Sequence, residues 1–357
     1  LINSKLKIKI QEQKNLITKQ ISELYQHDEI LSQYFSYEGY SFWCAIKPII
    51  QKLFEKRTEH IARDIQTIKA LFQKITIDTA VIPSEIGITE QIVINESKKH
   101  GIKLVLLQHG IYYDTKEAKE TNLSKGLYPV KSDKFLIWGK VSESDSKNNG
   151  FIEPTKLKII GHPGYDSWKP TSIHKDTSCV LLALSGPDHM FIQGHQVSDI
   201  MKFEKQLEQI CKVVTSMKKK LIIKVHPAFL FFDFSEMIKK ISSDIEIIST
   251  GSIMELINSC DVMIATNYTT AILESYLLQK PVICLPIIDY NLGIPTLFDF
   301  NAETNISIEK LQMTLEKLLC DKNFKNKTIQ RQNEFVENYL TDHENSSKKL
   351  LEYIETI

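Results

Sequence analysis

The stretch Val262-Met-Ile-Ala-Thr-Asn-Tyr-Thr-Thr-Ala-Ile-Leu-Glu274 indicates how the second half of this chain folds. Its first four residues are all apolar, which is typical of a strand buried on both faces of a sheet. A polar link leads to a helix predicted over Ala271–Gln279, and another apolar run follows at Val282–Leu285. Strand, helix and strand in this order predict a parallel β-α-β unit.

The same alternation extends through most of the 357 residues. In the second half, strands are predicted at Cys179–Leu184, Leu221–Val225, Ile245–Ile248, Val262–Ala265 and Val282–Leu285. In the first half they are predicted at Ala80–Pro83, Lys103–Leu107, Lys134–Trp138 and Leu157–Ile160, with a polar loop at Ser142–Gly150. A chain of this length is too long for one ordinary core. We therefore predict an α/β protein of two Rossmann-like, doubly wound domains that face a central cleft, where ligands of such sheets bind.

Four segments are predicted along the chain. Residues 1–75 form a helical lead-in, because they are rich in Lys, Glu, Gln, Leu and Ile at helical spacing and contain a single glycine, Gly39. Residues 76–170 form the N-terminal Rossmann-like domain, and residues 171–330 form the C-terminal one. Residues 331–357 form closing helices that pack back towards the first domain.

Charge balance and cysteine spacing exclude several classes of protein. The 44 basic residues balance 44 acidic ones and include only three arginines, so the basic face that a nucleic-acid partner requires is absent. The apolar runs are far shorter than the roughly 18 residues of a membrane span. Six scattered cysteines form no Cys-x-x-Cys pair, which argues against a zinc site or disulfides and for a reducing compartment. We expect a soluble, cytoplasmic protein without a metal, although the start at Leu1 leaves a trimmed N-terminal segment open.

Two groups of candidate residues follow strands of the first half. Gln108-His109-Gly110 comes directly after the run Leu104–Leu107, which places an imidazole at the rim of the sheet, with a plain strand-ending turn as the alternative. Glu85 follows the run through Ile82 and precedes a helix. Its carboxylate would serve there as a general base, or as an acid that the helix dipole stabilises.

The link before the helix at Ala271 predicts an anion site. Thr269 and Thr270 bring hydroxyls and free backbone N–H groups to a helix start, which suits a phosphate and goes beyond an ordinary threonine cap. An earlier strand ends in Lys224-Val-His226-Pro227, whose imidazole can donate to the same phosphate. With so few arginines, a phosphate would have to be held by helix starts, hydroxyls, histidine and lysine.

Glu274 and the loop after the first strand of the second half complete the candidates. Glu274 lies four residues after Thr270, where it would accept hydrogen bonds from a sugar or ribose hydroxyl, or simply favour the helix start. Ser185-Gly186-Pro187-Asp188 would bring a flexible loop and a carboxylate into the cleft, with a plain turn as the alternative. The motifs of dinucleotide-binding, P-loop, esterase and zincin enzymes are absent, which argues against those classes.

Taken together, these motifs resemble a known group, the bacterial surface-polysaccharide glycosyltransferases that use CMP-activated acidic sugars. The chain looks like the Kdo transferases of capsule and O-antigen and, more distantly, like sialyltransferases and polysialyltransferases. The second half is also similar to CDP-glycerol phosphotransferases and UDP-N-acetylglucosamine 2-epimerases. The residues that carry the resemblance are Glu85-x-Gly87, Gln108-His109-Gly110, Lys224-Val-His226-Pro227 and Asn267-Tyr-Thr269-Thr270-x-x-x-Glu274.

The resemblance implies a GT-B fold, in which the first domain faces the acceptor and the second binds the nucleotide of the donor. Contacts with the CMP phosphate would fall on His226, Thr269 and Thr270. The base motif departs from the polysialyltransferase pattern, because Ser84-Glu85-Ile86-Gly87 has one acid where that family has a pair. In a retaining reaction Asp188 or Glu85 would be the nucleophile. The catalytic candidates are Glu85, His109, Asp188 and His226, and the donor-binding candidates are Ser185, Gly186, Lys224, His226, Pro227, Asn267, Thr269, Thr270 and Glu274.

The predicted function is transfer of Kdo or a sialic-type nonulosonic acid from its CMP ester to a glycan of capsule, lipopolysaccharide or O-antigen. The partners are a nucleotide-sugar donor and a glycan acceptor, and no cofactor is expected. The alternatives are a CDP-glycerol-type phosphotransferase, an epimerase-like enzyme and a non-catalytic nucleotide-binding assembly subunit. The lysines at 218–220 are interpreted as a solvated helix face, with peripheral contact to the inner membrane as the other interpretation. The oligomeric state is not predicted.

Overall fold

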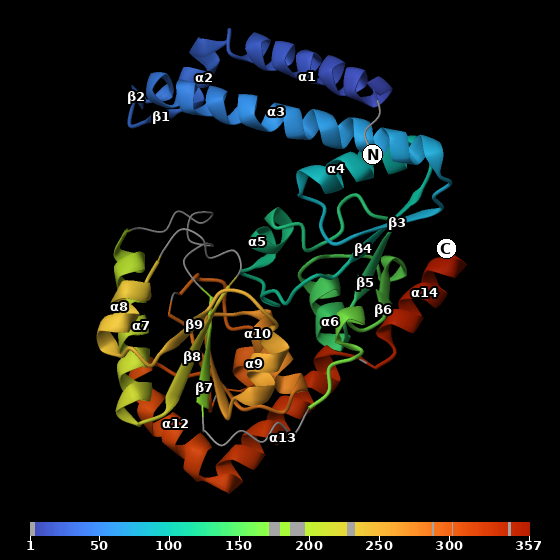
Figure 1. Ribbon diagram of the computed structural model, residues 1–357. Coiled ribbons are helices and arrows are strands. Elements are labelled where there is room, and N and C mark those ends of the chain that lie inside the picture. The colour runs from blue at the N-terminus through green and yellow to red at the C-terminus, as the bar shows by residue number, and fades with distance from the viewer. Residues whose placement is uncertain are drawn as a thin grey trace. The chain divides into compact units, whose positions relative to one another are not determined.

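The computed structural model describes residues 4–170, 179–185, 197–226, 233–287, 289–301, 303–341 and 344–357. Its internal contacts divide the chain into two compact units (Figure 1). Unit 1 comprises Leu1–Leu107, Pro129–Lys134 and Ile357, and unit 2 comprises Gln108–Tyr128 and Phe135–Thr356. This division differs from the predicted segments, whose boundaries at 75, 170 and 330 stay predictions.

Unit 1 begins with the expected helical lead-in. Helix α1 (Ser4–Leu24) lies along the longer α3 (Trp43–Lys74), and α2 (Asp28–Tyr34) with the short antiparallel strands β1 (Ser36–Tyr37) and β2 (Tyr40–Ser41) connects them (Figure 1). Helix α1 contains no buried residue, and α3 buries only Trp43, Thr58, Ala62 and Ile68.

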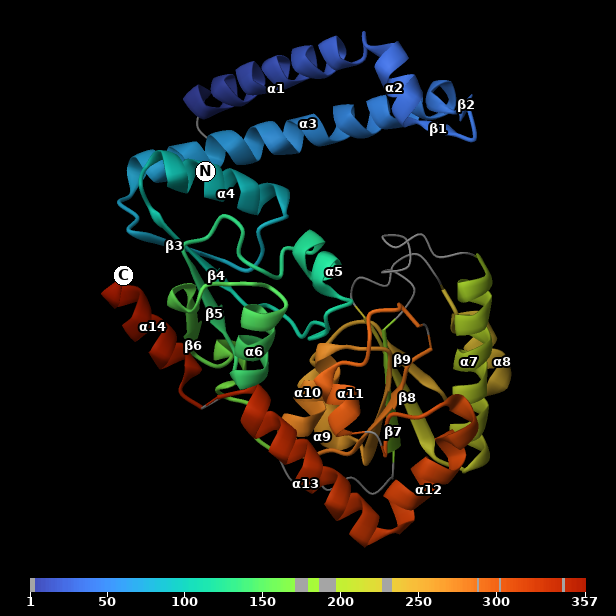
Figure 2. The same cartoon turned by 180° about the vertical axis from the view of Figure 1, so that it is seen from behind.

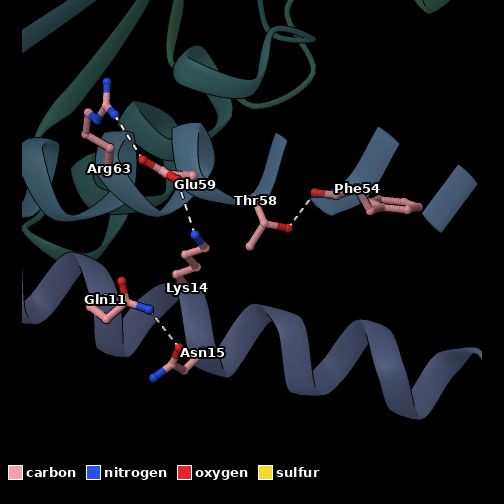
Figure 3. Close-up of polar contacts among 7 residues, drawn as sticks. All are labelled: Gln11, Lys14, Asn15, Phe54, Thr58, Glu59 and Arg63. Atoms are coloured by element: carbon pink, nitrogen blue, oxygen red, sulfur yellow. Dashed lines mark hydrogen bonds and ion pairs between the residues drawn. The ribbon is translucent and has the colours of Figure 1, made fainter. Parts of the chain in front are cut away.

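Polar contacts join the two long helices side by side (Figure 3). Lys14 Nζ on α1 lies 3.2 Å from Glu59 Oε2 on α3, and Arg63 pairs with the other oxygen of Glu59 at 3.5 Å. Within the helices, Gln11 donates to Asn15 at 2.9 Å and Thr58 donates to the Phe54 carbonyl at 2.7 Å. Because solvent screens such exposed pairs, they orient the helices more than they stabilise them.

The remainder of unit 1 is a β-α-β unit, as predicted. Strand β3 (Thr79–Ile82) pairs in parallel with β4 (Lys103–Leu107), and α4 (Ile88–Lys99) connects them. The helix stops at Gly101, whose φ of +67° lies in the left-handed region that favours glycine. The carboxyl ends of both strands then lead into Glu85 and Gln108.

The larger sheet of unit 2 consists of five parallel strands in the order β11-β10-β7-β8-β9. In chain order this is 5-4-1-2-3, so the winding direction reverses between β7 and β10. Open α/β sheets bind their ligands at such a switch point. The five strands are β7 (Cys179–Leu184), β8 (Lys220–Val225), β9 (Glu246–Ile248), β10 (Val262–Thr266) and β11 (Val282–Leu285).

Hydrophobic cores cover both faces of this sheet. Alternate residues of β7 point to opposite sides, so that Leu181 packs with Tyr276 of one core and Leu182 packs with Phe203 of the other. Every residue of β7 and β10 is buried, which explains the apolar sequence of β7 and of β10 up to Ala265. The covering helices are α7 (Val197–Ser216), α8 (Ser235–Ile241), α9 (Ile253–Ser259), α10 (Thr270–Leu277) and α12 (Leu311–Cys320).

Unit 2 also contains the parallel pair β5 (Lys134–Ile137) and β6 (Leu157–Ile159), joined through α6 (Lys140–Asn148). The predicted polar loop at Ser142–Gly150 is wrong, because most of it is this helix. Helix α6 buries Ser142, Asp145 and Ser146, so its inner face carries no apolar periodicity that would reveal it. Short elements complete the region: α5 (Lys119–Ser124), η1 (Pro154–Lys156), η2 (Pro163–Tyr165), α11 (Thr296–Phe300) and η4 (Ile308–Lys310).

The last two helices return to the β5–β6 pair. Figure 2 shows α13 (Lys322–Tyr339) passing from α12 towards α6, and α14 (Ser346–Thr356) beside β6. Thr341 N donates to Trp138 O at 2.9 Å, and Asp166 accepts the Ser346 N–H at 2.9 Å at the start of α14. No helix within the described ranges has the length and apolar character that would let it cross a lipid bilayer.

Candidate functional site

The ends of β7 and β10 are tied together at the switch point of the five-stranded sheet. Ser185 N donates to Thr266 Oγ1 at 2.9 Å, and Thr266 Oγ1 donates back to Ser185 O at 3.1 Å. Asn267 has a φ of +65°, and its amide donates to Ser185 O at 3.3 Å and accepts from Ile287 N at 3.0 Å. Asn267 therefore shapes the turn that leads into α10, because its short amide tolerates the left-handed backbone and bonds to both neighbouring loops.

Helix α10 starts at this turn and presents polar groups at its first residues. Thr269 is the N-cap residue in extended conformation, and within the described part of the chain its side chain makes no capping hydrogen bond. The first N–H groups of a helix have no partner inside the helix and carry the positive end of its dipole. The start of α10 therefore offers hydrogen-bond donors, and the anion site at this place stays a prediction.

A cavity of about 180 Å³ lies at this edge of the sheet. It brings together residues from the ends of β7 and β8 with the starts of α9 and α10. Five predicted binding residues line it together with His226, which was predicted for both binding and catalysis: Ser185, Lys224, Thr269, Thr270 and Glu274. The other lining residues are Ala183, Leu184, Val225, Ile253 and Ala271.

The two basic residues of the cavity lie in different surroundings. Lys224 is buried, its Nζ donates to Thr250 O at 3.1 Å, and desolvation lowers its pKa. His226 is exposed, and its backbone N–H donates to Leu184 O at 3.2 Å, which holds the end of β8 against β7. A ligand in the cavity therefore meets an accessible imidazole beside a partly desolvated ammonium group.

Glu274 gives the cavity a group that titrates near neutral pH. Its carboxylate accepts a hydrogen bond from Tyr165 Oη at 3.2 Å, and burial raises its pKa to about 7. Burial likewise raises the pKa of the Tyr165 phenol, so this phenol stays a donor. Carboxyl groups with a pKa close to the working pH are effective acids and bases. From the sequence, Glu274 was predicted to accept hydrogen bonds from a hydroxyl or to favour the helix start, and its pairing with Tyr165 was not predicted.

Glu85 lies in unit 1 and is engaged in protein contacts. One carboxylate oxygen accepts the N–H groups of Val130 and Lys131, at 2.9 and 2.8 Å. The other accepts the N–H and the hydroxyl of Ser132, at 2.8 and 2.5 Å. Only 4% of Glu85 is exposed. These four bonds anchor the segment 129–134 to β3, and the catalytic role of Glu85 stays a prediction.

The Gln-His-Gly segment lies in unit 2, where Gln108 is the structural residue. Its side-chain oxygen accepts from Trp138 N at 3.0 Å, its amide donates to Gly110 O at 3.1 Å, and its carbonyl accepts from the Trp138 indole at 2.9 Å. His109 is exposed and is not among the residues that line the 180 Å³ cavity. Three other predicted residues, Gly186, Asp188 and Pro227, lie outside the described residues.

The described ranges contain no group of three or more His, Cys, Asp or Glu side chains arranged to hold a metal ion. The hydrogen-bond donors of the cavity are the start of α10, the threonine hydroxyls, His226 and Lys224.

Solved structures share the fold of this chain at low sequence identity. The UDP-GlcNAc 2-epimerase from Neisseria meningitidis, bound to UDP-GlcNAc, is 13% identical with a TM-score of 0.60, over 84% of this chain and 82% of that one. The Methanocaldococcus jannaschii UDP-GlcNAc 2-epimerase with UDP-GlcNAc and UDP is 15% identical with a TM-score of 0.54, over 84% and 81%. Anabaena Alr3699/HepE with UDP-glucose is 14% identical with a TM-score of 0.55, over 83% and 82%.

These structural similarities confirm the predicted GT-B-type fold. At such low sequence identity they show the fold alone. No curated protein matches the chain. Residues 7–291 match the family described as LIC12162 family transferase. Because this match covers most of the chain, the protein belongs to the LIC12162 family of transferases.

Proposed function

We propose that this transferase is a glycosyltransferase that takes its sugar from a nucleotide-activated donor. The observation that carries the proposal is the 180 Å³ cavity at the switch point, where Ser185, His226 and the start of α10 converge. Phosphate groups bind well at such helix starts, because several N–H donors and the dipole act on the same atoms. The donor phosphate would lie against Thr269 and Thr270.

The same groups would assist departure of the nucleotide. As the glycosidic bond breaks, negative charge develops on the phosphate oxygen, and preorganised donors stabilise that charge more than they stabilise the bound ground state. The helix start and His226 are held by backbone hydrogen bonds and need little rearrangement during the reaction. Glu274, with its pKa near 7, would bond a ribose or sugar hydroxyl from the floor of the cavity.

For the donor, we propose the CMP ester of an acidic sugar, Kdo or a sialic-type nonulosonic acid. The support is the motif set Lys224-Val-His226-Pro227 and Asn267 to Glu274, which resembles the transferases that use such donors. The acceptor would be a bacterial surface glycan. We place the reaction in the cytoplasm, with peripheral membrane contact as a further prediction.

A UDP-sugar is the second candidate donor. It is favoured by the three structural relatives, which were solved with UDP-GlcNAc, UDP or UDP-glucose. At such low identity these relatives support the fold alone. The motif resemblance, in contrast, includes residues that line the cavity. We therefore rank the CMP donor first and keep UDP-sugar transfer or epimerisation as the alternative.

The first experiment is a thermal-shift comparison of CMP, CDP, UMP and UDP at equal concentrations. A ligand at a hundred times its Kd stabilises the native state by about 2.7 kcal/mol, so selective binding is visible as a higher midpoint. Stabilisation by CMP above the other three is expected, and it should be lost in His226→Ala. Preference for UDP would replace the CMP donor by the UDP alternative, and preference for CDP would point to alditol-phosphate transfer.

Turnover then separates an enzyme from a non-catalytic subunit. The protein is incubated with CMP-Kdo or CMP-sialic acid and a mixture of surface oligosaccharides, and released CMP is measured against a donor-only control. Acceptor-dependent release is expected for a transferase. A protein that binds CMP but releases none with any donor would be the assembly subunit.

A further inference from the structure

Unit 2 contains a second, larger cavity of about 550 Å³ that shares no lining residue with the donor cavity. Its size lies in the range of ordinary small-molecule sites. The lining comes from four separate stretches: Asp114 and Lys116 after β4, residues 140–149 on and just after α6, α11, and the end of α13. Nothing in the sequence motifs described above points to this place.

The floor of the second cavity is a buried carboxylate. Only 4% of Asp145 is exposed, and its oxygens accept hydrogen bonds from Tyr128 Oη at 2.6 Å and from Asn149 Nδ2 at 2.7 Å. Burial raises its pKa to about 6. Each carboxylate oxygen can still accept a further hydrogen bond, so Asp145 and Asn149 offer a ligand fixed polar groups.

One wall of the cavity is aromatic. Phe300 on α11 remains 37% exposed and packs against the buried Phe335 of α13, with ring centroids 5.9 Å apart. An exposed phenyl ring beside asparagine and aspartate side chains presents an apolar face next to hydrogen-bonding groups. This combination matches a sugar ring, which has an apolar C–H face and hydroxyls around its edge.

The rim of the cavity carries two lysines. Lys116 and Lys140 are exposed and form no ion pair within the described part of the chain. The two carboxylates of the cavity already accept hydrogen bonds from the protein, Asp114 from the Thr296 N–H at 2.9 Å and Asp145 from Tyr128 Oη at 2.6 Å. The two exposed ammonium groups can contact an anionic substituent at the outer end of a ligand.

A contact between two tyrosines joins the segments that carry the two cavities. The rings of Tyr113 and Tyr268 lie 4.7 Å apart. Tyr113 precedes Asp114 of the larger cavity, and Tyr268 precedes Thr269 of the donor cavity. Direct transfer of a sugar requires donor and acceptor to be bound next to each other, and the contact between Tyr113 and Tyr268 joins the segments that precede Asp114 and Thr269.

We infer that the 550 Å³ cavity binds a saccharide unit of the acceptor glycan, and that this unit carries a carboxylate or phosphate group. The ring lies on Phe300, its hydroxyls bond Asn148, Asn149 and Asp145, and Lys116 and Lys140 attract its charge. The assignment of this saccharide as the acceptor rests on the proposed glycosyltransferase function, whereas binding of the saccharide itself does not.

The test is binding of the full-length protein to an array of defined oligosaccharides that are neutral, uronic-acid-containing or phosphorylated. Wild type should bind anionic members above neutral ones. Asn148→Ala and Lys140→Ala should each weaken this binding by about five- to tenfold, as expected for one lost hydrogen bond or charge contact. Lys147→Ala is the matched control, because Lys147 lies on the same helix, pairs with Glu143 and does not line the cavity. Phe300→Ala tests the aromatic wall independently.

Nucleotide binding, measured on the same variants, separates this inference from the proposed function. Loss of saccharide binding in the Asn148 and Lys140 variants, with CMP stabilisation retained, supports a separate acceptor cavity. Loss of saccharide binding only in His226→Ala would place the glycan in the donor cavity and overturn the inference. Equal binding by wild type and all cavity variants, or no binding to any oligosaccharide, would also overturn it. If Asn148→Ala and Phe300→Ala abolish CMP binding while His226→Ala does not, both assignments fail.

Discussion

Replacing Glu274 with glutamine should raise the free energy of unfolding of the ligand-free protein. This increase should become larger as the pH rises from 5 to 8. Burial raises the pKa of this carboxyl group from 4.5 to about 7. Between these values the folded chain still holds the proton that the unfolded chain has lost. Folding with an intact Glu274 therefore becomes less favourable as the pH rises through this window, and the cost is constant above it.

The magnitude follows from the same two pKa values. They differ by about 2.5, and one pKa unit corresponds to 1.36 kcal/mol, so full ionisation of Glu274 costs the folded state about 3 kcal/mol. At pH 5 only about 1 kcal/mol of this cost is present, because this pH lies only slightly above the unfolded pKa of 4.5. Glutamine carries no charge and keeps an oxygen that can accept from Tyr165, so it avoids the cost at every pH.

The assay is urea unfolding of wild type and Glu274→Gln at pH 5, 6, 7 and 8 without nucleotide. The difference in the free energy of unfolding should widen by about 2 kcal/mol from pH 5 to pH 8. Glu316→Gln, an exposed change on α12, serves as the control and should show no such trend. A constant difference between wild type and Glu274→Gln across this range would refute the argument that burial disfavours the ionised carboxylate.

Three further predictions concern the donor cavity and the chain that supports it. His226→Ala should lower turnover about 10²–10³-fold if the imidazole stabilises the leaving phosphate. His60→Ala on α3 is the control and should leave turnover unchanged. Equal rates in wild type and both variants would reject the role of His226 in stabilising the phosphate. The affinity for CMP should fall as the pH rises through about 7, because ionised Glu274 repels the phosphate, and calorimetry should show a flatter profile in Glu274→Gln. Gly161→Ala should destabilise by more than about 2 kcal/mol, since a Cβ would lie 2.6 Å from Thr341 O at a φ of +83°. Gly251→Ala, at a φ of +85° with nothing within 4 Å, should cost only about 1 kcal/mol in the same unfolding assay.

The main strands could be predicted from the sequence because a run of consecutive apolar residues indicates a strand that is buried on both faces. Every residue of β7 and β10 is buried, so β7 and the first four residues of β10 are continuous apolar runs. The helical lead-in was equally readable from its spacing. Helix α6 was missed, because its buried face is made of Ser142, Asp145 and Ser146 and looks like a loop.

The donor cavity was partly predictable for a related reason. In a parallel sheet, residues that follow neighbouring strands must meet at one edge, so Ser185, His226 and Thr269 could be grouped before the structure was known. The acid–base property of Glu274 could not be predicted. It depends on burial and on Tyr165, which lies 109 positions away along the chain.

The contacts of Glu85 also lie beyond what a local pattern shows. Its place after β3 and before a helix predicts a general base, and its oxygens accept hydrogen bonds from groups 45 to 47 positions away. No local pattern reveals such a partner.

The sequence by itself determined the order of the main strands, the helical lead-in and several of the residues that converge at the switch point. These follow from local stereochemistry and from the period of apolar side chains, both of which act over a few residues. Only the tertiary structure decided the pKa of Glu274, the anchoring of Glu85 and the existence of the 550 Å³ cavity. Those depend on which distant segments pack together, because desolvation and cavity shape arise from contacts between residues that are far apart in the chain.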